Sequence, residues 1–122
     1  MKIVDKNNNK IKTITEWGDY FLSNKSKEGQ WEVGRSAHSI ADFILNQNGE
    51  KKINAIVSKL LNENIELNSA IPEYEVRFDK YGHGREHDLG IFGETTSGKS
   101  IFIGVEAKVD ESFGEKIRDA YL

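Results

Sequence analysis

The sequence contains no cysteine and only one proline among its 122 residues. Without cysteine the chain has no disulfide, no thiolate metal ligand and no cysteine nucleophile, a composition typical of proteins in a reducing compartment. It also has no apolar run of about 18 residues, and its N-terminal segment lacks the apolar core of a signal peptide. We therefore expect a cytoplasmic protein that makes no membrane contact.

Positive charge is also scarce, because 17 lysines and arginines stand against 20 aspartates and glutamates, for a net charge of −3. No overall basic field attracts nucleic acid, so any contact with DNA or RNA has to come from a local patch. With 37% hydrophobic and 30% charged residues, the chain fits one globular domain with a single core.

The hydrophobic pattern divides the expected domain, residues 1–122, into three parts. Residues 1–30 predict an N-terminal arm and a short helix with Thr15 as its N-cap. Residues 31–71 predict a helical part, in which Ser36 caps one helix and Gly49 ends it. An amphipathic helix follows, with one apolar stripe made of Ile53, Ile56, Val57, Leu60 and Leu61. Pro72 is expected to separate these helices from a β part, residues 72–122.

After Pro72 the hydrophobic period changes from 3.6 to 2, which predicts strands at 74–78, 88–92 and 100–109. From Phe113 onward the pattern again favours a helix. The expected fold class is α+β: two or three N-terminal helices, then a three-stranded, mostly antiparallel sheet and a C-terminal helix.

Residues 93–100, GETTSGKS, match the phosphate-binding pattern G-x-x-x-x-G-K-S. That motif requires a helix directly after it, whereas the residues after Ser100 are Ile-Phe-Ile-Gly-Val, which favour a strand. A polar loop with a glycine between two strands is typical of a hairpin. We therefore interpret this segment as a hairpin turn.

In a strand over 100–109, Glu106 and Lys108 share one face, next to Gly104, while the other face is apolar. A hairpin at 95–99 would bring Asp88 beside them on the preceding strand. Two carboxylates can hold Mg²⁺ or Mn²⁺, and a neighbouring lysine can orient an attacking water. The competing interpretation is an ordinary exposed Glu-Lys pair on a half-solvated sheet.

Asp88 followed by Glu106-Ala107-Lys108 on the next strand resembles the motif of the PD-(D/E)XK nuclease superfamily. The segment WEVGRSAHSIADFI (31–44) is similar to a W-x-x-G-R-S-A pattern in uncharacterised bacterial proteins with this strand arrangement. The resemblance covers residues 31–118 and implies a shortened restriction-endonuclease-like core. It implies metal ligation by Asp88 and Glu106, and catalysis by these two residues with Lys108. The first helix would supply a further acid: Asp42, Glu63 or Glu66.

The chain departs from this family in two places. His87 precedes Asp88 where the family has proline, and the sequence ends within the expected last helix, so the strand that should follow is absent. An uncovered sheet edge would then bind a partner or a second copy. Two further functions follow: a catalytically idle nuclease-fold protein, such as a phage or mobile-element inhibitor of a nucleic-acid-processing defence complex, and one half of a two-chain enzyme.

Three other positions are candidates for binding. Arg85 is a candidate phosphate contact beside the site, and Arg35 is a candidate anion contact at the start of the 36–47 helix. His83 and His87 flank Arg85 in sequence; a zinc site is one interpretation of this pair, and ordinary loop polarity is the other. The favoured function is metal-dependent phosphodiester hydrolysis, with protein binding as the alternative.

Overall fold

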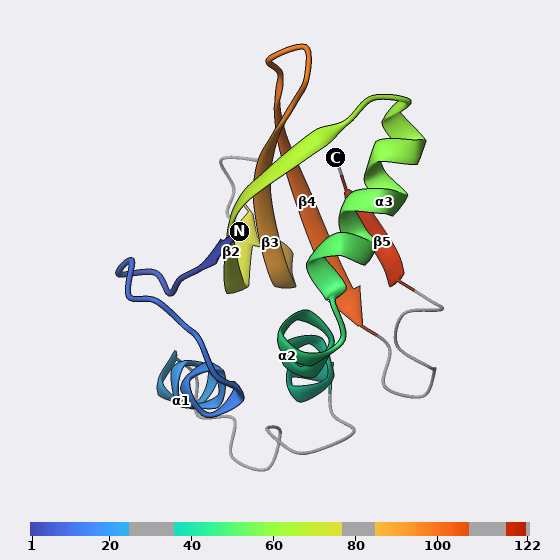
Figure 1. Ribbon diagram of the computed structural model, residues 1–122. Coiled ribbons are helices and arrows are strands. Elements are labelled where there is room, and N and C mark those ends of the chain that lie inside the picture. The colour runs from blue at the N-terminus through green and yellow to red at the C-terminus, as the bar shows by residue number, and fades with distance from the viewer. Residues whose placement is uncertain (25–35, 77–84, 108–116, 122) are drawn as a thin grey trace.

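The computed structural model describes residues 1–24, 36–76, 85–107 and 117–121 (Figure 1). Its fold is α+β, as predicted, with helices on one face of a mixed sheet. The elements in chain order are β1 (Lys2–Ile3), α1 (Ile14–Asn24), α2 (Ser36–Asn46), α3 (Gly49–Leu61), β2 (Ile65–Val76), β3 (Arg85–Thr95), β4 (Ser100–Ala107) and β5 (Ile117–Tyr121).

The described strands form one sheet in the order β1-β2-β3-β4-β5, in which β1 is parallel to β2 and every other pair is antiparallel. The predicted three-stranded sheet is therefore too small. The predicted C-terminal helix is wrong where the structure describes it, because residues 117–121 form β5. In this strand Arg118 is opposite Glu106 and Tyr121 is opposite Gly104, so pairing with β4 overrides the local helical pattern.

The boundary predicted at Pro72 is also wrong, because β2 begins at Ile65 and contains the proline. Strand β1 pairs with β2 only at Ser69 and Ala70. Among the described strands, β2 therefore has a partner on one side only at Pro72, which is the setting in which a sheet accepts proline.

The helices cover one face of the sheet, and their apolar residues meet the inward residues of β2, β3 and β4. This core contains Ile40, Phe43, Ile53, Val57, Leu67, Leu89, Ile91, Ile103 and Val105, all buried. The stripe predicted for α3 is confirmed at Ile53 and Val57. It is wrong at Ile56 and Leu60, which are 43% and 67% exposed.

Thr13, rather than Thr15, caps helix α1. The Glu16 N–H donates to Thr13 Oγ1 at 3.1 Å, and the Thr13 N–H donates to Glu16 Oε1 at 3.1 Å. This reciprocal pair is a capping box, which satisfies backbone N–H groups that the helix itself leaves without partners.

Gly49 begins α3 instead of ending α2, which ends at Asn46. A Cβ atom at Gly49 would lie 2.7 Å from both the ring Cδ2 and the carbonyl oxygen of Phe43. Glycine at this position therefore allows α3 to start directly against α2.

The segment that matches the phosphate-binding pattern is a hairpin turn, as predicted. The Thr95 N–H donates to the Lys99 carbonyl at 2.9 Å, Gly98 has a φ of 87°, and β4 begins at Ser100. The turn projects at the end of the sheet remote from α1 and α2 (Figure 1). None of the helices in the described part of the chain is long and apolar enough to cross a membrane.

Candidate functional site

Asp88 on β3 and Glu106 on β4 both lie just beyond the last regular pair of the β3–β4 hairpin. Leu89 is opposite Val105 and Gly90 is opposite Gly104, so the next positions along the two strands are Asp88 and Glu106. These two residues lie at the end of the hairpin away from its turn. The hairpin predicted between the two strands is confirmed, and the convergence of the two carboxylates stays a prediction.

The Asp88 carboxylate is fixed by the backbone of β4. Its Oδ2 accepts a hydrogen bond from the Ala107 N–H at 2.9 Å. A carboxylate that accepts a backbone N–H is held in one orientation, and such bonds commonly orient carboxylates that ligate metals. The Asp88 carboxylate is therefore held in one orientation next to the backbone of Ala107.

Glu106 lies beside a buried histidine. His87 Nδ1 is 3.7 Å from Glu106 Oε1, and the His87 side chain is 0% exposed while that of Glu106 is 21% exposed. The His87 ring lies over Gly104, where a Cβ atom would be 2.7 Å from its Cε1. His87 thus fills the space above Gly104, beside Glu106.

Strands β2 and β3 both change faces at this point. Leu89 belongs to the core under the helices, whereas His87, two residues away, contacts Gly104 and lies 5.8 Å from the Phe102 ring on the opposite face. On β2, Tyr74 likewise packs against Phe92 and Phe102 on that opposite face. In regular strands residues two apart share a face, so the backbones are twisted around Glu73 and Asp88.

Glu73 is the buried acid that sequence reasoning missed. It lies between Pro72, opposite Leu89, and Tyr74, opposite His87, which places it across from Asp88. Its side chain is 5% exposed and its φ is 54°, in the left-handed region that non-glycine residues rarely adopt. Strained backbone of this kind concentrates at functional sites. The only sequence signal was an acid directly after proline.

An aromatic cluster occupies the sheet face opposite the helices. Tyr74 and Phe92 meet edge to face with centroids 5.2 Å apart, and the Phe92 and Phe102 centroids are also 5.2 Å apart. Gly90 lies beneath this cluster, since a Cβ atom there would be 2.9 Å from Tyr74 Cβ. The three rings are half-buried.

The further acids considered from sequence do not join Asp88 and Glu106. Glu66 is opposite Glu94 near the turn end of the hairpin. Asp42 accepts hydrogen bonds from the side-chain amides of Asn46 and Gln47, which lower its pKa. Within the described ranges no three His, Cys, Asp or Glu side chains could hold one metal ion.

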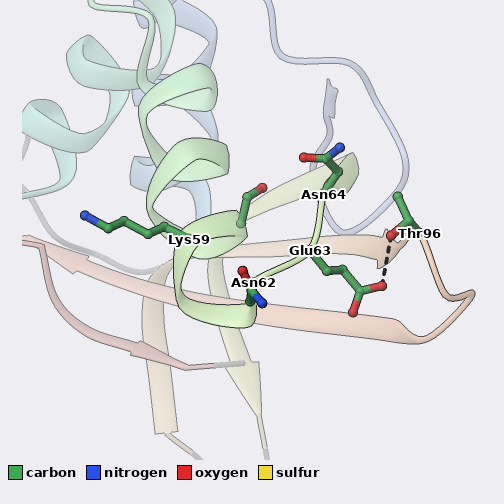
Figure 2. Close-up of a pocket in the computed structure, with 6 residues that line it drawn as sticks. Lys59, Asn62, Glu63, Asn64 and Thr96 are labelled. Atoms are coloured by element: carbon green, nitrogen blue, oxygen red, sulfur yellow. Dashed lines mark hydrogen bonds between the residues drawn. The ribbon is translucent and has the colours of Figure 1, made fainter.

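Glu63 stabilises the hairpin turn rather than the site (Figure 2). Its Oε1 accepts the Ser97 N–H at 2.8 Å and the Thr96 hydroxyl at 3.0 Å. Hydrogen bonds from Ser97 and then from Thr96 hold the pKa of Glu63 below its usual value of 4.5. Figure 2 shows Glu63 pointing toward Thr96 in the turn, and both residues line one pocket with Lys59 and Asn62.

Several predicted site residues lie outside the described residues. Lys108, Arg35 and His83 fall in the undescribed ranges, and Arg85 is described only as the first residue of β3, without its side chain. Their predicted roles therefore stay predictions.

Comparison with known proteins gives a family but no activity. No curated protein and no solved structure matches the chain. One family model, described as a domain of unknown function (DUF6946), matches residues 10–121. Because this match spans nearly the whole sequence, the chain belongs to the DUF6946 family.

Proposed function

We propose that this domain is a divalent-metal-dependent phosphodiester hydrolase with its site at the end of the β3–β4 hairpin away from the turn. One observation carries the proposal: the Ala107 N–H fixes the Asp88 carboxylate beside the backbone of β4, next to Glu106 in sequence and just beyond the last regular pair, Leu89 and Val105. The Asp, Glu and Lys pattern that resembles PD-(D/E)XK nucleases agrees with this arrangement.

The chemistry of the donors suits a hard cation. Mg²⁺ is commonly bound through one or two carboxylates, with water and substrate phosphate oxygens filling its other positions. Asp88 and Glu106 would be the two carboxylates, and Mn²⁺ prefers the same oxygen donors. When bound, such an ion supplies positive charge next to the phosphate and lowers the pKa of water.

The residues of the chain have distinct roles in this proposal. The Ala107 N–H orients Asp88, and His87 lies against Glu106, where a buried imidazole at 3.7 Å can limit the movement of the carboxylate. Lys108, two residues after Glu106, would orient the attacking water or stabilise negative charge on the phosphorus. Arg85, at the start of β3, would contact a flanking phosphate.

Calorimetric titration of Mn²⁺ into the purified protein tests the proposal. We expect saturable binding by the wild type, and its loss in both Asp88→Asn and Glu106→Gln. Glu94→Gln is the matched control, because Glu94 is an exposed acid at the other end of β3. Equal binding by wild type and Glu106→Gln, or no binding by folded wild type, would overturn the proposal.

A hydrolysis assay then separates metal binding from catalysis. Labelled single-stranded DNA, duplex DNA and RNA are incubated with protein and Mn²⁺, and cleavage is followed on denaturing gels. We expect cleavage of at least one substrate and its loss in Lys108→Ala, which keeps both metal ligands. Metal binding without cleavage of any substrate would contradict the hydrolase function.

A second candidate function is protein binding through the sheet edge. Among the described strands, β5 pairs with β4 only, and an edge strand can accept a strand from a partner. Its test is the mass in solution by light scattering, with Asp119→Pro in β5 as a variant that removes a backbone donor. If the measured mass stays that of a monomer at every accessible concentration, a second copy of the chain is not the partner.

A further inference from the structure

Three lysines surround one depression at the N-terminal edge of the sheet. Lys2, Lys10 and Lys12 line a pocket of about 230 Å³ whose other lining residues are Met1, Ile3 and Ile11. All three lysines are exposed. The chain has a net charge of −3, so this grouping is a local basic patch on an acidic protein.

The hairpin that carries this patch brings like charges together. Val4 pairs with Lys10 in an antiparallel bridge, and the Ile11 N–H donates to the Ile3 carbonyl at 2.8 Å, so Lys2 lies close to Lys12. Like charges facing each other destabilise a strand pair.

Acids border the patch on the side of Lys10, which lines an adjoining pocket with Asp5, Glu16 and Asp19, but these carboxylates form no ion pair with the lysines in the described part of the chain. Asp5 accepts hydrogen bonds from Asn7 and Asn9, and Glu50 pairs with the N-terminal amine at 3.0 Å. Among the described residues no carboxylate forms an ion pair with any of the three lysines. The arrangement therefore fits an anionic ligand.

The basic patch continues into the aromatic cluster along one row of the sheet. Lys2 is opposite Ser69, Ser69 is opposite Phe92, and Phe92 is opposite Phe102. Directly opposite residues share a face, so Lys2 begins a row that runs onto the partly exposed Phe92 and Phe102. Proteins bind single-stranded nucleic acids by combining positive charge along the backbone with aromatic rings on which bases stack.

Charge also sets the direction in which an anionic strand can run. On the same face, next to Phe92 and toward the turn, Glu66 is opposite Glu94, and these two acids repel phosphate. In the other direction lie Gly90, Gly104 and then the Asp88–Glu106 end, where the proposed metal ion would offset the charge of the two carboxylates during hydrolysis. With strands about 4.8 Å apart and about 3.3 Å per residue, Lys2 is roughly 16 Å from Asp88.

We propose that a single-stranded nucleic acid binds along the N-terminal edge of the sheet and across the face opposite the helices, with phosphates at Lys2, Lys10 and Lys12 and bases stacked on Phe92 and Phe102. This proposal rests on the hydrolase function for its phosphodiester ligand and deepens it by naming a single-stranded substrate. The strand passes from the basic patch toward Asp88 and Glu106. Binding itself requires no metal ion.

Fluorescence anisotropy of a labelled oligothymidylate of about 20 nucleotides, in EDTA, tests the binding. The triple variant Lys2→Gln/Lys10→Gln/Lys12→Gln should bind at least about tenfold more weakly, and the slope of log affinity against log salt should fall by about 2. The control triple variant Lys51→Gln/Lys59→Gln/Lys99→Gln makes the same change in net charge with exposed lysines elsewhere and should bind nearly as well as wild type.

A second variant tests the aromatic row. Phe102→Leu keeps the apolar volume against Tyr74 but removes the stacking surface, and it should weaken binding by about fivefold or more. Circular dichroism and urea unfolding establish that each variant is folded. Unchanged binding by a folded Phe102→Leu protein would exclude stacking on this ring.

The remaining outcomes are decisive as well. If both lysine triple variants weaken binding equally, net charge alone explains the binding and the patch has no specific role. If the wild type does not bind, the proposal is wrong. Inorganic phosphate is added at the concentration of phosphate groups in the oligonucleotide. If it displaces the oligonucleotide, the patch binds a single phosphate ion and the proposal is wrong. Because binding is measured in EDTA, a failure of the Mn²⁺ titration to show a metal site leaves this test independent.

Discussion

The carboxylate of Asp88 on β3 takes a backbone hydrogen bond from Ala107 on β4 at 2.9 Å. Continuation of the β3–β4 register beyond Leu89 and Val105 would place Ala107 opposite His87. The His87 side chain instead turns to the opposite face of the sheet, and the Asp88 side chain provides an acceptor for the Ala107 N–H. One acid thus joins the two strands where their regular pairing ends.

We expect Asp88→Ala to lower the free energy of unfolding by about 1.5–3 kcal/mol, because it removes a hydrogen bond to a charged acceptor and leaves the buried Ala107 N–H without it. Asp88→Asn keeps an acceptor oxygen and should cost less, about 0.5–1.5 kcal/mol. Urea unfolding measures both. Asp19→Ala, at an exposed acid on α1, should change stability by less than about 0.5 kcal/mol. Equal effects at positions 88 and 19 would mean that the bond to Ala107 adds no stability.

The packing of His87 over Gly104 gives a second prediction. Gly104→Ala places a Cβ atom 2.7–2.9 Å from three atoms of the buried imidazole, and such overpacking costs about 1–3 kcal/mol. In a His87→Ala background the same substitution should cost far less, because the clashing ring is absent. Urea unfolding of the four proteins in this cycle measures the coupling. A Gly104→Ala penalty that is independent of His87 would show that the ring does not limit this position.

The hairpin, and the position of Asp88 and Glu106 at its open end, could be predicted from sequence because their signals are local. Alternation of apolar residues defines both strands, TSGK defines the turn, and counting outward from the turn brings Asp88 to Glu106. The inward set on β4 follows from the same alternation and is confirmed at Ile103, Val105 and Ala107.

The errors lie where tertiary contacts decide the conformation. Residues 117–121 have helical spacing, but pairing with β4 makes them a strand. The sequence predicts a boundary at Pro72, but β2 continues through this proline. The strand tolerates Pro72 because the pairing of β1 with β2 ends at Ala70. The face change at Glu73 and Asp88 could not be predicted, because a positive φ at a glutamate has no signature in a single sequence.

The capping box of α1 gives a third prediction. Thr13→Ala should lower the free energy of unfolding by about 1 kcal/mol, because it removes the acceptor for the Glu16 N–H. Thr15→Ala is the matched control: Thr15 is exposed and inside the helix, where alanine has the higher helix propensity. Thermal unfolding should show a lower Tm for Thr13→Ala only. A lower Tm for Thr15→Ala alone would reassign the cap.

The contacts between Glu63 and the β3–β4 turn give a fourth prediction, on pH dependence. Because hydrogen bonds from Ser97 and Thr96 hold the pKa of Glu63 below 4.5 in the folded protein, the charged form stabilises the fold above the unfolded pKa. This contribution is lost as the pH falls below about 4.5 and through the lower folded pKa.

Glu63→Gln isolates this contribution, because glutamine keeps an acceptor oxygen for the turn but has no charge to lose. Asp5 and Asp42 also have lowered pKa values, yet both are present in wild type and variant, so their effects cancel in the comparison. We expect the wild type to have the higher Tm near neutral pH, with the difference shrinking toward zero as the pH falls below 4.5. A difference in Tm that stays constant across this range would show that the ionised carboxylate of Glu63 does not stabilise the turn.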